Sequence, residues 1–92
     1  MAKLALSDTF VSQRNDISVE RTRAKIDKAL RMLAGMPELG SRQVPLSAKA
    51  RFGAGIRKLS ISPYLIVYRY DRPSDVVFVY CLLYVPAIRE AW

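Results

Sequence analysis

The chain has 92 residues, 51% of them hydrophobic, and its 15 Lys and Arg against 8 Asp and Glu give a net charge of +7. This is the size of one domain with a modest core, and so high an apolar fraction argues against intrinsic disorder. With no His and one Cys, Cys81, an intramolecular disulfide is excluded and neither a metal site nor a cofactor is expected. The positive charge favours a polyanionic or acidic partner.

No segment predicts export or insertion into a membrane. The opening MAKLALSD has too short an apolar stretch before Asp8 for a signal peptide. The longest apolar run, residues 76–85, is about half the length of a spanning helix and is rich in β-forming residues. Together with the lone Cys81, these features predict a cytoplasmic protein.

The first half of the chain predicts a short strand and a helical hairpin. Residues 3–6 fit a strand, and Ser7 or Asp8 can cap a short helix that carries Phe10 and Val11. After a break at residues 15–16, apolar side chains recur at helical spacing to about residue 34: Val19, Thr22, Ile26, Ala29, Leu30 and Leu33. Gly35 and Pro37 then end the second helix.

The second half predicts a basic loop followed by antiparallel strands. Residues 40–55 are expected to form a long loop, with an early strand at residues 43–46 as one option. Strands follow at residues 56–61, 64–70 and 76–85, the last two joined by Asp-Arg-Pro-Ser-Asp. The fold class is therefore α+β, with an N-terminal short strand and helical hairpin packed on a mostly antiparallel twisted sheet.

The tyrosines follow a period of two. If Tyr70 pairs with Val76, all five tyrosines share one face of the last hairpin: Tyr64, Tyr68, Tyr70, Tyr80 and Tyr84. The other face is aliphatic and suited to packing against the helices: Leu65, Val67, Val77, Val79, Cys81, Leu83 and Val85. Two interpretations of the tyrosine face remain: it binds a partner or substrate, or residues 86–92 fold back and cover it.

One combination of motifs resembles a known family. A helix that ends in Pro-Glu-Leu-Gly is followed by a basic loop, a Gly55-Ile56-Arg57 turn, Leu59 and the strand Tyr64-Leu-Ile-Val-Tyr68-Arg69. This order resembles the RelE/ParE toxin superfamily of bacterial type II toxin-antitoxin systems, with the ParE branch favoured. The resemblance implies that residues 1–92 form a single toxin-like domain and that a cognate antitoxin neutralises it.

The resemblance implies a ParE-like inhibitor of DNA gyrase, which is not an enzyme. The alternative is a RelE-like, ribosome-dependent mRNA endonuclease, and a third option is a non-toxic member that only binds its partner. Two departures bear on this choice. The His that many ParE-like chains carry after the last strand is replaced by Tyr84, and an Arg common in RelE-like chains is replaced by Ser60 or a neighbour.

Three sets of site residues are expected. Target contacts are assigned to Lys49, Arg51, Arg57 and Lys58, which lie in a stretch without acidic residues between Glu38 and Asp71. Antitoxin contacts are assigned to Tyr64, Tyr68, Tyr80 and Trp92, and catalysis, only in a RelE-like enzyme, to Arg57, Tyr84 and Arg89. The alternative for Arg57 is structural, as a brace that ties the basic loop to the sheet through backbone carbonyls.

Overall fold

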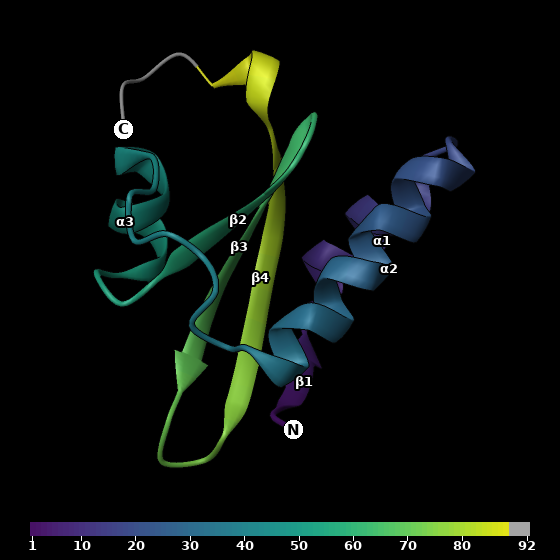
Figure 1. Ribbon diagram of the computed structural model, residues 1–92. Coiled ribbons are helices and arrows are strands. Elements are labelled where there is room, and N and C mark those ends of the chain that lie inside the picture. Colours follow the sequence, from purple (N-terminus) through teal and green to yellow (C-terminus); the bar gives the residue numbers. More distant parts are fainter. Residues whose placement is uncertain (89–92) are drawn as a thin grey trace.

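A four-stranded sheet with helices on both faces forms the frame of the molecule (Figure 1); the structure is a computed structural model that describes residues 1–88. The elements are β1 (Lys3–Leu6), α1 (Asp8–Asp16), α2 (Glu20–Gly35), α3 (Leu46–Phe52), β2 (Arg57–Ile61), β3 (Tyr64–Asp71), β4 (Val76–Tyr84) and a 3-10 turn, η1 (Val85–Ala87). The strand order is β1-β4-β3-β2, with β1 parallel to β4 and the other pairs antiparallel. The expected α+β class is confirmed.

The start of α1 is fixed by Ser7, as the sequence predicts. Its Oγ accepts a hydrogen bond from the backbone N–H of Phe10 at 3.0 Å and donates one to the carbonyl of Tyr80 at 2.5 Å. The cap therefore satisfies a free helix N–H and also ties α1 to β4. Phe10, in the first turn of α1, is fully buried, whereas its neighbour Val11 is exposed.

The predicted apolar face of α2 builds the larger core. Ile26, Ala29, Leu30 and Leu33 are buried against the sheet, on the same side as Phe10 of α1. Val19, at the start of the same pattern, is instead 56% exposed because α2 begins only at Glu20. The helix ends at Gly35, which confirms the stop predicted from Gly35 and Pro37.

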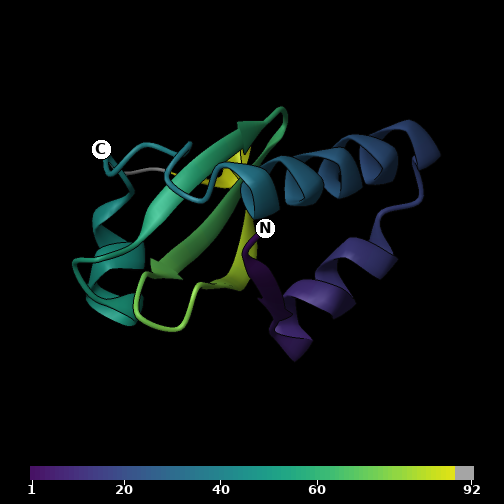
Figure 2. The ribbon, with the colours of Figure 1, turned by 60° about the horizontal axis from the view of Figure 1, so that its bottom comes forward.

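The opposite face of the sheet is covered by α3, a helix that the sequence did not predict (Figure 2). Ala48 of this helix packs with a second, smaller group of buried side chains: Val44, Ile56, Val67 and Cys81. The strand suggested for residues 43–46 is wrong: α3 begins at Leu46, and the isolated bridge in this part of the chain lies earlier, between Ser41 and Lys58. Seven residues are too few for helical periodicity to stand out, so packing on the sheet decides this element.

The register of the last hairpin differs from the predicted one. Asp71, not Tyr70, pairs with Val76, so Tyr70 faces Val77 and Tyr68 faces Val79. A bulge opposite Val67 and Tyr68 then inserts Tyr80 as an extra residue, after which Val67 pairs with Cys81 and Tyr64 with Tyr84. A shift of one residue turns every side chain to the other face, and the bulge turns the second half of β4 back again.

Two corrections follow from this register. Tyr64, Tyr68 and Tyr70 pack with the core under α1 and α2, together with Val77 and Val79, so the tyrosines do not form an open face. Tyr80 lies on the α3 side instead. The predicted aliphatic face is split for the same reason, since Val67 and Cys81 pack under α3 while Val77 and Val79 pack under the helical hairpin.

Candidate functional site

Tyr68 is a core residue of the sheet. It is fully buried, and its hydroxyl oxygen accepts a hydrogen bond from the backbone N–H of Gly40 at 2.8 Å. Burial raises the pKa of Tyr68, and the Gly40 N–H opposes this rise. Tyr68 is thus part of the core in this structure, and its contact with an antitoxin stays a prediction.

The other two tyrosines assigned to antitoxin binding, Tyr64 and Tyr80, lie on opposite faces of the sheet. The Tyr64 ring contacts the Tyr84 ring, with 5.6 Å between centroids, at the end of the sheet beside η1. Tyr80 lies under α3 on the opposite face. Trp92 and Arg89 are outside the described residues, and the roles of Tyr64 and Tyr80 stay predictions.

The four basic residues expected to contact a target do not form one surface. Lys49 and Arg51 are exposed on α3, whereas Arg57 and Lys58 begin β2. Because consecutive strand residues point to opposite faces, Arg57 is directed to the α2 side and Lys58 to the α3 side. Arg57 is thus separated from the other three, and their common role stays a prediction.

Arg57 braces the loop that follows α2. Its Nη1 donates to the Gly40 carbonyl at 2.8 Å and the Glu38 carbonyl at 3.3 Å, and its Nη2 lies 3.3 Å from the Glu38 carboxylate. The side chain is only 15% exposed, which confirms the bracing alternative inferred from the sequence. The guanidinium is well suited to this work because its planar fork satisfies several oxygens at once.

Arg57 and Tyr84 are not brought together. Arg57 pairs with Tyr68, while Tyr84 pairs with Tyr64, which faces Ile61 at the far end of β2. Arg57 and Ile61 are four residues apart along the strand, or roughly 13 Å at the rise of an extended chain. The two residues are therefore separated by much of the sheet's length.

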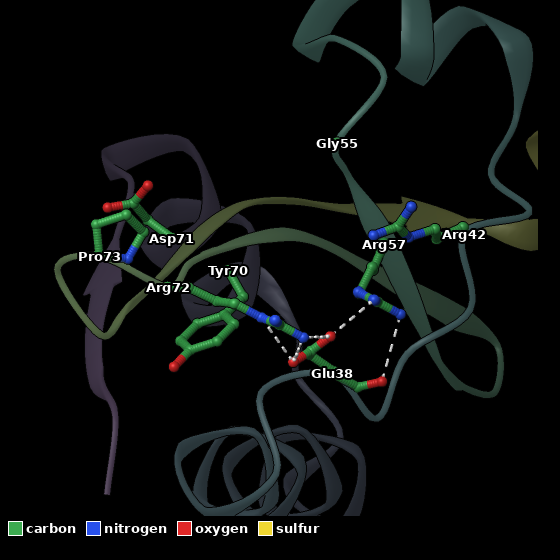
Figure 3. Close-up of a pocket in the computed structure, with 8 residues that line it drawn as sticks. All are labelled: Glu38, Arg42, Gly55, Arg57, Tyr70, Asp71, Arg72 and Pro73. Carbon is green, nitrogen blue, oxygen red and sulfur yellow. Dashed lines mark hydrogen bonds and ion pairs between the residues drawn. The ribbon is translucent and has the colours of Figure 1, made fainter.

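Glu38 is the centre of an arginine cleft that the sequence analysis missed (Figure 3). Its Oε1 accepts hydrogen bonds from Nε and Nη2 of Arg72, at 3.1 and 2.6 Å. Its Oε2 accepts hydrogen bonds from Nη2 of Arg72 at 2.8 Å and from Nη2 of Arg57 at 3.3 Å. Arg42 lines the same cleft, whose volume is about 440 Å³. These residues come from three separate segments, so no local sequence pattern would have grouped them.

The α3 side of the sheet carries two contacts between arginine and aromatic rings. Phe52 of α3 stacks on Tyr80, with centroids 4.8 Å apart and the Arg51 guanidinium 5.0 Å from the Phe52 centroid. Arg69 lies 5.0 Å from the Phe78 centroid and donates to the Tyr80 hydroxyl at 3.0 Å. Cationic groups over rings and stacked aromatic pairs are typical of surfaces that bind partners.

A second groove runs between α2 and the edge strand β2. It has a volume of about 350 Å³ and is lined by Lys25, Lys28, Ala29, Met32 and residues 60–62. The backbone N–H and carbonyl of Lys58 point away from β3 and bond with Ser41. In an edge strand, the backbone groups of every second residue point to the same side. The backbone of Ser60 is therefore directed into the groove, beside an apolar floor and two lysines.

No group of three or more His, Cys, Asp or Glu in residues 1–88 is arranged to hold a metal ion. None of the helices described is long and apolar enough to cross a membrane. Cys81 is buried, and burial raises the pKa of its thiol, which fits the small core residue inferred from the sequence.

Comparison with known proteins agrees with the fold. The model of the ParE toxin family of type II toxin-antitoxin systems, parDE, matches residues 4–84. The isolated E. coli RelE toxin superposes with a TM-score of 0.71 at 16% identity, over 97% of this chain and 89% of that one. The intact E. coli RelBE toxin-antitoxin complex gives 0.66 at 20% identity, over 89% and 94%. A search of curated proteins finds no match.

Proposed function

Because the chain belongs to the ParE toxin family of type II toxin-antitoxin systems, we propose that it inhibits DNA gyrase and is neutralised by a cognate antitoxin. The family match over residues 4–84 carries this proposal. The target follows from the resemblance of the Gly55-Ile56-Arg57 turn and the Tyr64–Tyr68 strand to the ParE branch. Inhibition then depends on binding, and no catalytic group is required.

The target surface in this proposal is the α3 side of the sheet. Lys49 and Arg51 are exposed there, next to the stacked pair of Phe52 and Tyr80. The positive charge attracts an acidic surface, while the aromatic pair offers rigid apolar area for a specific contact. Arg57 supports this surface from behind by fixing the loop that leads into α3.

The antitoxin surface in this proposal is the groove between α2 and β2. An acidic amphipathic segment fits it, because Lys25 and Lys28 supply charge, Ala29 and Met32 supply apolar area, and the Ser60 backbone offers hydrogen bonds to an added strand. Tyr64 lies beside this groove, since it pairs with Ile61 at the end of β2. In this proposal Tyr64 therefore contacts the antitoxin, as expected from the sequence.

The test is supercoiling of relaxed plasmid by gyrase with the purified chain added, alone and after incubation with its antitoxin. We expect inhibition that the antitoxin reverses. Lys49→Glu with Arg51→Glu should abolish inhibition, whereas Lys25→Glu with Lys28→Glu should leave inhibition intact and prevent its reversal. Both variants change two exposed lysines or arginines, so each controls for the effect of charge on the other. Full supercoiling in the presence of a folded chain would refute the gyrase target.

A RelE-like nuclease is the second candidate, and the similarity to RelE structures is the observation that favours it. The distance along the sheet between Arg57 and Tyr84 and the bracing role of Arg57 weigh against the catalytic set that includes both. Mapping of mRNA cleavage on translating ribosomes distinguishes the two functions. Normal growth on expression without antitoxin would instead indicate a member that only binds its partner.

A further inference from the structure

The cleft around Glu38 contains more positive charge than its own carboxylate neutralises. Arg42, Arg57 and Arg72 line it and are opposed at its centre by one carboxylate, that of Glu38, which leaves a formal charge of +2. Asp71 also lines the cleft but points away from Glu38 (Figure 3), toward Ser74 Oγ at 2.5 Å and Arg69 at 3.6 Å. The excess charge is therefore local to the three arginines.

The three arginines differ in how many hydrogen-bond and ion-pair partners they already have. Arg57 and Arg72 are held by Glu38, whereas Arg42 has no hydrogen-bond or ion-pair partner within residues 1–88. Arg57 cannot move freely because it also binds the carbonyls of Glu38 and Gly40. The cleft thus contains one fixed guanidinium, that of Arg57, an exposed one paired with Glu38, that of Arg72, and an open one at its wall, that of Arg42, an arrangement suited to binding an oxyanion.

We propose that this cleft binds a phosphate dianion, free or as a terminal monoester, with Arg42 as its first contact. A dianion neutralises the remaining charge of +2, and its several oxygens can each accept hydrogen bonds from guanidinium groups of the cleft. A carboxylate carries half that charge and two coplanar oxygens, and Glu38 already supplies one. Glu38 is the internal competitor, since its oxygens occupy N–H groups of Arg57 and Arg72 that phosphate would share.

Titration of the intact chain with inorganic phosphate, followed by amide chemical shifts, tests the site. We expect saturable shifts at the amides of residues 38–42 and 70–72. Arg42→Ala should weaken binding by roughly tenfold, the effect of losing one charge-assisted hydrogen bond. Glu38→Gln should tighten it, because the amide carries no negative charge and keeps only one of the two oxygens that accept hydrogen bonds from Arg57 and Arg72. Arg21→Ala removes an equal charge from the exposed face of α2 and should change nothing.

Three probes identify the chemistry at equal ionic strength. Inorganic phosphate and a nucleoside 5′-monophosphate should produce the same shifts, and tighter binding of the nucleotide would identify a monoester as the ligand. Acetate should produce none. Equal responses to acetate and phosphate, or equal weakening by Arg42→Ala and Arg21→Ala, would overturn the proposal. These measurements use the isolated chain, so their outcome is independent of gyrase inhibition.

Discussion

At the residue scale, Gly40 shows why the Pro-Glu-Leu-Gly motif ends in glycine. A Cβ at this position would lie 2.5 Å from the Lys58 carbonyl oxygen and 2.6 Å from the Tyr68 hydroxyl, both of which are fixed by hydrogen bonds. The absence of a side chain lets the loop pass directly over the end of the buried tyrosine. In the same motif, Glu38 pairs with two of the three arginines of the cleft, Arg57 and Arg72.

We expect Gly40→Ala to destabilise the protein by about 2 kcal/mol. The added methyl group must displace the loop, and the buried Tyr68 hydroxyl then loses its partner. Denaturant unfolding measures the change. Gly35→Ala is the matched control, because a Cβ there meets nothing within 4 Å. Equal free energies of unfolding for the two variants would show that the loop yields without cost.

At the scale of elements, Gln13 joins α1 to the part of β4 that β1 does not reach. β1 pairs with β4 only as far as Leu6 opposite Val79. Farther along, the Gln13 side chain accepts from the Leu82 backbone N–H at 2.7 Å and donates to the Leu82 carbonyl at 3.0 Å. The Gln13 amide thus makes the two backbone hydrogen bonds that a longer β1 would have made with Leu82, and it fixes α1 to β4.

We expect Gln13→Ala to cost roughly 1–3 kcal/mol of stability, because two backbone groups of β4 lose their partner. Hydrogen exchange of the Leu82 amide is the direct measurement, and it should become faster in the variant under conditions where the native state opens locally. Ser12→Ala, on the exposed side of α1, is the control. Unchanged protection of the Leu82 amide would mean that water replaces the glutamine.

At the scale of the whole molecule, the dependence of stability on pH follows from a few named groups. The Arg14 guanidinium donates to both oxygens of Asp27, at 2.8 and 2.6 Å, and holds the pKa of that carboxyl below its usual 3.8. Ser74 lowers the pKa of Asp71 in the same direction. Burial raises the pKa of Tyr68 above its usual 10.0, and the hydrogen bond to Asp75 raises that of Tyr70.

We therefore expect a plateau of stability between acidic and alkaline losses. A lowered carboxyl pKa stabilises the fold above the unfolded value of 3.8, and this contribution is lost as pH falls toward the folded value. A raised tyrosine pKa stabilises it below 10.0, and this is lost as pH rises toward the folded value. No His titrates between them. Melting temperatures across pH measure the profile.

Asp27→Asn is the variant that separates the acidic contribution. It should flatten the loss of stability below about pH 4 relative to the wild type, because the group that titrates is removed. Asp16→Asn, at an exposed position at the end of α1, is the matched control for the loss of one carboxylate. A profile for Asp27→Asn that follows the wild type would mean that the Arg14 pair contributes nothing to folding.

Local patterns in the sequence determined most of the elements of this protein. Ser7 caps α1, the period of Ile26, Leu30 and Leu33 gives the buried face of α2, and three apolar runs become β2, β3 and β4. The core position of Cys81, inside an apolar run, was also predicted from the sequence. These features depend on neighbours within about one helical turn or along one strand, where residue spacing alone sets geometry.

Tertiary structure decided the faces of the sheet and the grouping of charged residues. The Asp71–Val76 pairing turns the first half of β4 to the faces opposite to those predicted, and the extra residue Tyr80 leaves the face of the other tyrosines and lies on the α3 side. Glu38, Arg57 and Arg72 meet because the loop after α2 crosses the start of β2 and the turn after β3. Register and long-range contact depend on the packing of the whole chain, so no single segment of sequence encodes them.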